Sequence, residues 1–411
     1  MCQRAILPRV SAAPGPLADL VVLDFTRVLA GPYCTRLLAD LGARVIKIER
    51  PGEGDEMRRA HLQLDPGRDD QSTYYTRVNV GKESVALDLA HPAARDVVRD
   101  LARRADVAIE NFVPGVAAKL GCDAEALQAV KPDLVYCSIS GFGQSGPWRD
   151  RAAFAHIVNA ASGMMALERG DMPAPRAANI QAADVLAGTH AFGAILAALW
   201  RRARTGQGAR LDVSMLEALV ACDDVSYGAV LNGGEEMGAP RPGMWVFEVG
   251  GRHIAFQTGG APLLWPRLVG LLGRPELADD PRFATPLARR DNQEALRAVL
   301  TEWLARFATA EEALAALGAA RIPCAPVLAP REVVAHPHLA ARQFFPAVPH
   351  PTRGSVRVTG TPFHLDGAPL GPAGPAPYRI GEHTRPVLEG LLGYDKARMD
   401  ALSTAGAIAI P

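Results

Sequence analysis

Apolar residues in the first half of the chain alternate between short strand-like runs and longer stretches with helical spacing. The strand-like runs are 20–25, 43–49, 84–89, 106–110 and 134–139. Helical spacing runs from Gly31 and Pro32 to Leu41 and recurs over 93–104. Strands that alternate with helices at these lengths predict a mainly parallel sheet with right-handed crossovers, and therefore an α/β fold.

The middle of the chain has helical composition, and the residue composition changes after it. Helices are predicted over 156–167, 184–204 and 215–229, with a short strand at 210–214. A loop rich in Gly, Glu and Pro runs from 231 to 245, and a more compact α/β segment extends from 246 to 327 with helices at 292–307 and 310–317. The tail at 331–374 predicts loops and two β segments. A chain of 411 residues exceeds one ordinary core, so two domains or one elaborated domain are expected.

The longest apolar stretch, 183–200, approaches the length of a membrane span. It carries Asp184, Thr189 and His190, and Arg201 and Arg202 follow it. Polar groups of this kind are costly in lipid, so a buried core helix is predicted and no membrane partner.

Charge and cysteine usage narrow the classes of partner. Forty-four basic residues balance forty-four acidic ones, so no global field attracts nucleic acid. The cysteines lack the spacing of a metal site, which predicts no metal and reduced thiols in a cytoplasmic protein. They are Cys2, Cys34, Cys122, Cys137, Cys222 and Cys324.

Basic residues near the predicted strand ends are candidate phosphate contacts. Ligands of parallel sheets bind beside these loops, although any single basic residue there is more often a solvated rim. The residues are Arg44, Lys47, Arg50, Lys82 and Lys119. NAD is disfavoured, because the turn after the first strand, DFTRVLAGP, lacks the G-x-G-x-x-G pattern.

Asp184 begins the apolar stretch and has two interpretations. As a helix N-cap, its side chain accepts a backbone hydrogen bond. As a nucleophile, it uses the same helix N-terminus to stay ionised in a poorly solvated pocket. Position alone leaves both open. The loop GFGQSGP at 141–147 is likewise either a surface turn or a close backbone approach to a ligand, and His156 and His190 are by default core histidines.

Seven stretches, in order along nearly the whole chain, resemble the class III CoA-transferase (CaiB/BaiF) family, which includes formyl-CoA transferase, carnitine CoA-transferase and α-methylacyl-CoA racemase. They are LDFTRVLAGPYCTRLLADLGARVIKIERP, ADVAIENFVPG, ISGFGQSGP, AADVLAGTHAFGAILAAL, RTGQGARLDVSM, IPCAPV and GEHT.

The resemblance implies a fold and an assembly. A large Rossmann-like domain would be formed by both chain ends, 1–225 plus 328–411, with a smaller α/β domain at 226–327. Two subunits would be interlocked like linked rings in a homodimer.

The resemblance also implies site residues and substrates. The nucleophile falls on Asp184, and the CoA contacts on Val28, Ala30, Arg50, Lys82, Asn111, Phe112 and Lys119. The substrates would be an acyl-CoA and a small carboxylic acid, with no tightly bound cofactor. Asp184 would pass through a mixed anhydride and an aspartyl-CoA thioester, with oxyanion donors from the backbone of Leu29, Ala30 and Gly31. Leu29 stands where some transferases of the family carry a glutamine.

Two other functions stay open. A racemase needs a histidine two residues before His156 and an acid near Gly259, and this chain has Phe154 and glycines there. A catalytically silent CoA-binding protein would keep the fold without exchange, which the intact Asp184 disfavours.

The acyl and acceptor pocket is expected along 151–159. Arg151, Phe154 and His156 are its candidate residues. His156, with Arg149 or Arg151, would hold the distal carboxylate of a short dicarboxylate such as succinate, mesaconate, citramalate or itaconate. The sequence does not choose among these acids, or between transfer to a second molecule and transfer within one.

Overall fold

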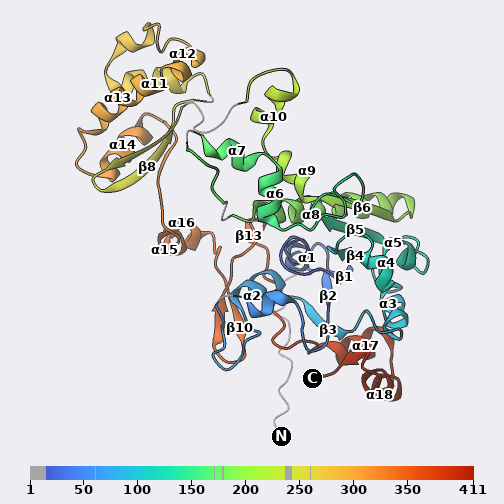
Figure 1. The fold of residues 1–411 in the computed structure, drawn as a ribbon. Helices are drawn as coiled ribbons and strands as arrows, with labels where there is room; N and C mark the ends of the chain where they lie inside the picture. Colours follow the sequence, from blue (N-terminus) through green and yellow to red (C-terminus); the bar gives the residue numbers. More distant parts are fainter. Residues whose placement is uncertain (1–14, 61, 171, 178–179, 237–242, 260) are drawn as a thin grey trace. The chain divides into compact units, whose positions relative to one another are not determined.

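The computed structural model describes residues 15–60, 62–170, 172–177, 180–236, 243–259 and 261–411. The chain divides into two compact units (Figure 1). One comprises 1–165, 176–227 and 337–411, and the other comprises 166–175 and 228–336. The segments 166–175 and 328–336 belong to the second unit, whereas the prediction placed both in the large domain.

The first unit is built on a seven-stranded sheet with the order β14-β3-β2-β1-β4-β5-β6. All neighbours are parallel except β14, which pairs antiparallel with β3. The 3-2-1-4-5-6 order is that of doubly wound Rossmann sheets. The strands are β1 (Val21–Asp24), β2 (Arg44–Glu49), β3 (Glu83–Leu87), β4 (Val107–Glu110), β5 (Val135–Ser140), β6 (Ala209–Ser214) and β14 (Ile408–Ala409). The predicted α/β fold with a mainly parallel sheet is confirmed.

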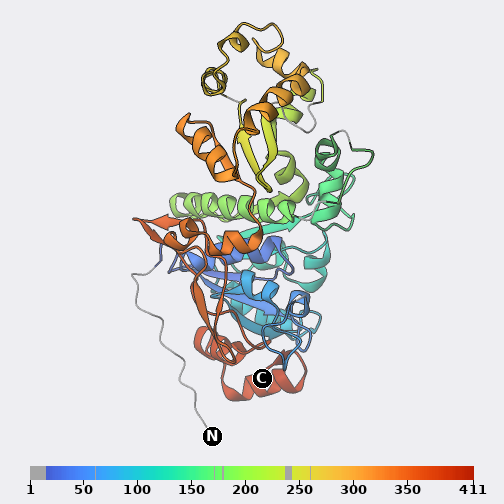
Figure 2. The same ribbon diagram turned by 90° about the vertical axis from the view of Figure 1, so that its left-hand side faces the viewer.

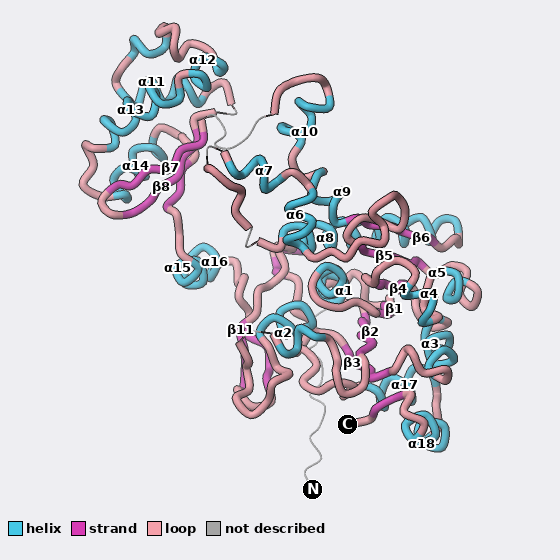
Figure 3. Tube along the Cα trace, in the orientation of Figure 1, coloured by secondary structure: helices cyan, strands magenta, loops and turns pink. Residues whose placement is uncertain are grey.

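Helices cover both faces of this sheet (Figure 3). Successive strand residues point to opposite faces, so Val22 packs into one core and Leu23 into the other. The first face is covered by α1 (Ala30–Asp40), α6 (Ala155–Ala161), α8 (Ala182–Thr205) and α9 (Met215–Val220). The second face is covered by α3 (Ala94–Ala102), α5 (Ala124–Gln128), α17 (Thr384–Leu392) and α18 (Lys396–Thr404).

The long helix α8 appears as an uninterrupted green helix in Figure 2. Of the described helices it alone is long and apolar enough to cross a membrane. Ala187, Ala191 and Ile195 on one side of it are buried in the first core, which agrees with the predicted core helix. Trp200 is 67% exposed, so the opposite side is uncovered in the single chain.

Two predicted helices are interrupted. The segment 156–167 forms α6 and α7 (Met164–Arg169), because Gly163 between them has a φ of +86°. The segment 215–229 forms α9 and α10 (Asp224–Leu231). Helical composition continues through both breaks, so hydrophobic spacing alone did not reveal them.

The C-terminal segment completes the β3 edge of the sheet. Gly381 N donates to Ser84 Oγ at 2.8 Å, and Ser84 N donates to His383 Nδ1 at 3.1 Å. Thr384 Oγ1 accepts from Ala86 N at 2.9 Å. The GEHT motif at 381–384 therefore binds the C-terminal segment to β3, which lies about 300 residues earlier in the sequence.

The second unit has a three-stranded antiparallel sheet and its own core. Its strands are β7 (Met244–Val249), β8 (Arg252–Gln257) and β9 (Cys324–Pro326). Its longest helices are α11 (Leu264–Leu272), α13 (Gln293–Leu304) and α14 (Ala310–Ala319). Trp245, Phe247 and Phe256 of the sheet pack with Leu300 of α13 and Leu317 of α14 in this core.

Candidate active site

The turn between β1 and α1 has an unusual backbone. Val28 has a φ of +69°, a conformation that is rare for a β-branched side chain. Arg27, the residue before Val28, is held by two hydrogen bonds with Asn111, which lies just after β4. Asn111 Nδ2 donates to Arg27 O at 2.7 Å, and Asn111 Oδ1 accepts from Arg27 N at 2.8 Å. Strain of this kind persists only where surrounding contacts enforce it and is common at active sites.

Asp184 lies in the first turn of α8, close to the start of α1. It is the third residue of α8, whose N-cap is Gln181, so of the two interpretations left open by the sequence the N-cap one does not hold. The side chain is 9% exposed. Burial raises the pKa of Asp184 to about 6, and hydrogen bonding from the Ala30 N–H and the charge of His156 oppose the rise. At neutral pH the carboxylate is mostly ionised but poorly solvated, as a nucleophile requires.

A close contact between α1 and α8 places Ala30 beside Asp184. A Cβ added at Gly188 would lie 2.5 Å from Ala30 O and 3.4 Å from Cys34 N. Only glycine therefore permits this approach, one helical turn after Asp184. Ala30, the first residue of α1, lines the same cavity as Asp184, so the N–H groups of the first turn of α1, which have no partner within the helix, lie near the carboxylate.

A cavity of about 200 Å³ opens beside Asp184 within the first unit. Its wall contains seven of the predicted site residues: Val28, Ala30, Asn111, Phe112, Arg151, Phe154 and Asp184. They come from the ends of β1 and β4, the loop after β5 and the first turn of α8. The carboxyl ends of the parallel strands thus converge on one site, as in other open α/β sheets.

Other predicted residues lie outside that wall. Arg50 is exposed and pairs with Glu53 at 3.1 Å, and Lys119 on α4 (Val116–Leu120) is exposed. Leu29 and Gly31 are buried on either side of Ala30. His156 on α6 is exposed but acts on the charge of Asp184.

Lys82 does not have the exposed ammonium expected of a phosphate contact. Its Nζ is fully buried and donates to Asp24 Oδ2 at 3.0 Å, Asn79 Oδ1 at 2.8 Å and Pro32 O at 3.0 Å. Burial lowers the pKa of Lys82 to about 8, against the opposing charge of Asp24. Lys82 is therefore a structural cation in this structure.

Sequence reasoning did not identify two charged residues in the wall, Arg27 and Glu56, which pair with each other at 3.3 Å. The available signal for Arg27 was its place in the turn after the first predicted strand, because ligands of parallel sheets bind beside such turns. Arg149 and Arg151, both considered from the sequence, follow the glycine loop and also line the cavity. The Arg151 guanidinium lies 4.4 Å from the Trp148 ring centroid.

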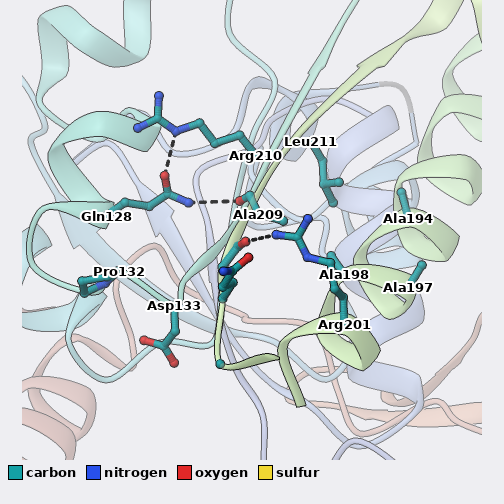
Figure 4. Close-up of a pocket in the computed structure, with 13 residues that line it drawn as sticks. Gln128, Pro132, Asp133, Ala194, Ala197, Ala198, Arg201, Ala209, Arg210 and Leu211 are labelled. Carbon is teal, nitrogen blue, oxygen red and sulfur yellow. Dashed lines mark hydrogen bonds between the residues drawn. The ribbon is translucent and has the colours of Figure 1, made fainter. Parts of the chain in front are cut away.

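A second, wider cavity of about 780 Å³ lies at the opposite, amino-terminal end of β5 and β6 (Figure 4). Its wall includes Arg201, Gln128 and Arg210, and Arg210 Nε donates to Gln128 Oε1 at 2.7 Å. None of the predicted site residues lines it. The smaller cavity, which contains the buried carboxylate with the raised pKa, is therefore the better candidate.

Among the described residues, no group of three or more His, Cys, Asp and Glu side chains is arranged to hold a metal. The five described cysteines are free, and Cys34, Cys122 and Cys137 are buried. Cys2 lies outside the described residues.

Comparisons with a family model, with curated proteins and with solved structures agree with one another. The family model "CoA-transferase family III" matches residues 17–384. The mouse succinyl-CoA:glutarate CoA-transferase is 34% identical over 96% of this chain and 90% of its own. The formyl-CoA:oxalate CoA-transferase of Streptomyces avermitilis is 34% identical over 95% of this chain and 99% of its own. The crystal structure of a CAIB/BAIF family protein from Brucella suis aligns with a TM-score of 0.76 and 32% identity, over 92% of this chain and all of the other.

Proposed function

The chain belongs to CoA-transferase family III and is an enzyme of that class, and from this premise we propose that Asp184 carries CoA between two carboxylic acids. The observation that supports this role is a buried carboxylate with a raised pKa, in a cavity wall and facing the N-terminus of α1. The curated relatives fit this transfer and not the racemase alternative.

The proposed cycle has four balanced acyl transfers. Asp184 attacks the donor thioester and expels CoA thiolate, which leaves a mixed anhydride. The thiolate attacks the aspartyl carbonyl, which gives aspartyl-CoA and releases the donor acid. The acceptor carboxylate then attacks aspartyl-CoA and expels CoA thiolate, which leaves a second mixed anhydride. The thiolate attacks the acceptor carbonyl of this anhydride, which gives the product acyl-CoA and frees Asp184. The Ala30 N–H, with its neighbours at Leu29 and Gly31, stabilises the oxyanions that develop at the aspartyl carbonyl.

The remaining substrate contacts follow from position. Val28, Ala30, Asn111 and Phe112 line the cavity and would contact the thioester end of CoA. The exposed Arg50 and Lys119 would neutralise its phosphates. No cofactor beyond the CoA substrate is required by this cycle.

We also propose a cytoplasmic homodimer with interlocked subunits. The uncovered apolar side of α8, which includes Trp200, supports an interface there, since exposed apolar surface of this kind marks association sites. Light scattering would show twice the 43.6 kDa chain mass if this is right.

We predict that the purified enzyme converts succinyl-CoA and a carboxylate from a panel into a new CoA ester, detected by mass spectrometry. Such exchange is expected because the buried carboxylate can accept an acyl group from one thioester and pass CoA to another acid. No exchange with any pair, together with deuterium uptake at the α-carbon of a 2-methylacyl-CoA, would contradict the prediction and favour the racemase.

We predict that His156→Ala and Arg151→Ala each reduce kcat/KM for dicarboxylates about tenfold more than for monocarboxylates. Arg151 lies in the cavity wall and His156 lies close enough to affect Asp184, so each can hold a distal carboxylate. The two relatives described above act, by their names, on glutarate and oxalate, which are both dicarboxylates.

Steady-state kinetics with succinate and butyrate measure this difference. Arg201→Ala, in the wall of the second cavity, is the control and should leave the ratio unchanged. An unchanged preference in both test variants would remove these side chains from acceptor selection.

A further inference from the structure

The β1–α1 turn is held by buried charges as well as by Asn111. Thr26 N donates to Asp24 Oδ1 at 2.9 Å, and Lys47 Nζ donates to Thr26 O at 2.7 Å. Val28 N lies 3.4 Å from Asp55 Oδ1, which accepts its hydrogen bond. Every residue from Thr26 to Val28 is thus held through its backbone by a side chain from another part of the unit.

Lys47, at the carboxyl end of β2, is central to this arrangement. Its ammonium pairs with Asp55 Oδ2 at 3.0 Å, and both side chains are fully buried. Asp24 also acts on Lys47 electrostatically and is itself paired with Lys82. Asp55 is fixed in turn, because its Oδ1 accepts from Met57 N at 3.0 Å and its own N–H donates to Glu49 Oε1 at 3.0 Å. A buried ion pair with this many supporting hydrogen bonds has a single geometry.

The turn transmits this geometry to the start of α1. A Cβ added at Gly31 would lie 2.3 Å from Thr26 Cβ, so Thr26 packs directly against the first turn of the helix. Ala30, the residue before Gly31, lines the same cavity as Asp184, and its backbone N–H lowers the pKa of that carboxylate. If Val28 relaxes from its positive φ, the N–H of Ala30, two residues later, moves with it.

We propose that Lys47 and Asp55 are positioning residues of the transfer reaction, holding the strained turn so that the N-terminus of α1 faces Asp184. The inference rests on the proposed role of Asp184 as nucleophile. Neither residue lines the cavity, so both act through the Thr26–Ala30 backbone and not by touching the substrate.

The test is the double variant Lys47→Met/Asp55→Asn. Removing both charges together leaves no unpaired buried ion, and Asp24 keeps Lys82, so the fold is retained. The amide oxygen introduced at position 55 can still accept from Met57 N and Val28 N, but the donor to Thr26 O is lost with the Lys47 ammonium. We expect kcat to fall about tenfold or more, since a misplacement of about 1 Å at a reacting group has effects of that order.

The pH profile distinguishes positioning from a general loss of stability. Weaker hydrogen bonding from Ala30 makes the anion of Asp184 less favourable, so the acid limb of kcat should move to higher pH by about half a pH unit or more. The acceptor should be an acid fully ionised above about pH 5. The titratable and charged groups around Asp184 are His156 of α6, Tyr74 of α2 (Thr73–Asn79), and Arg27, Glu56, Arg149 and Arg151 of the cavity wall. All of these groups are unchanged in the variant.

The matched control is Arg202→Met/Asp106→Asn at the other end of the same sheet. Arg202 pairs with Asp106 at 2.8 Å, and Asp106 Oδ2 accepts from Val21 N, so this pair also holds the β1 backbone. It should lower the thermal midpoint without changing kcat or the acid limb. If the Lys47 variant matches this control in both readouts, the proposal is overturned.

If the double variant does not fold, Lys47→Gln/Asp55→Asn should move kcat and the acid limb in the same directions by less, because it likewise leaves no unpaired buried ion and lets two amides hydrogen bond in place of the ion pair. No movement would again overturn the proposal. The wild type is measured in parallel. An absent acid limb and absent dependence on Asp184 in the wild type would reject the nucleophile and, with it, the inference.

Discussion

Asp184→Asn is expected to lose CoA transfer by about 10⁴-fold or more and to unfold at higher denaturant concentration than the wild type at about pH 7.5. The amide cannot form the anhydride. The stability gain arises because burial raises the pKa of Asp184 from 3.8 to about 6. An ionised, desolvated carboxylate costs free energy in the folded state that an amide does not.

The sign of the pH dependence follows from proton binding. Between about pH 4 and 6 the folded wild type holds a proton on Asp184 that the unfolded chain has released, so wild-type stability falls as pH rises through this window. The variant has no such proton. Its advantage should be absent near pH 4 and reach up to about 3 kcal/mol above about pH 6.

Urea unfolding at about pH 4, 5 and 7.5 measures this difference, and the thioester exchange assay measures the activity. Asp133→Asn is the matched control, because Lys131 hydrogen bonds to this carboxylate and holds the pKa of Asp133 below its usual value. That variant should gain no stability and keep full activity. Retained transfer in Asp184→Asn would eliminate the proposed nucleophile.

Gly188→Ala is expected to lower kcat at least about tenfold and to destabilise the fold by about 1–3 kcal/mol. Helix propensity alone favours alanine by about 1 kcal/mol. The added Cβ would lie 2.5 Å from Ala30 O, a backbone atom that cannot rotate away, so steric overlap outweighs propensity. The helices must separate at the point where Ala30 faces Asp184.

Gly390→Ala in α17 tests propensity without overlap, because an added Cβ there meets nothing within 4 Å and α17 covers the other face of the sheet from the proposed interface. It should be neutral or stabilising. Thermal unfolding and steady-state kinetics on the two variants give the result, and a fully active Gly188→Ala would show that the approach of α1 to α8 is unimportant for transfer.

The sequence predicted the sheet well, because strand position depends on local patterning. Each of the runs at 20–25, 43–49, 106–110 and 134–139 contains or overlaps a strand of the structure. β14 was not predicted, because a two-residue strand at the chain end has no periodicity and forms only through its pairing with β3.

The sequence predicted which residues belong to the candidate site better than it predicted their surroundings. Asp184 was found as a carboxylate at the start of an apolar helix, but the rise of its pKa to about 6 depends on burial, which only the tertiary structure shows. Lys82 was predicted to be a phosphate contact, whereas its ammonium is buried and hydrogen bonded to Asp24 and Asn79. A lysine beside a strand looks the same in sequence whether its ammonium meets an aspartate from another strand or water, so only tertiary contacts distinguish the two.

The fastening of the C-terminal segment to β3 has a consequence for synthesis on the ribosome. The chain emerges from its N-terminus, so Ser84 of β3 is made 297 positions before its partner Gly381, and Ile408–Ala409 follow later still. Until these later residues have been made, the outer edge of β3 has no partner strand and Ser84 lacks its contacts with 381–383. An open edge strand invites pairing with other chains, so the nascent protein has its greatest need of chaperone protection on the β3 side of the sheet.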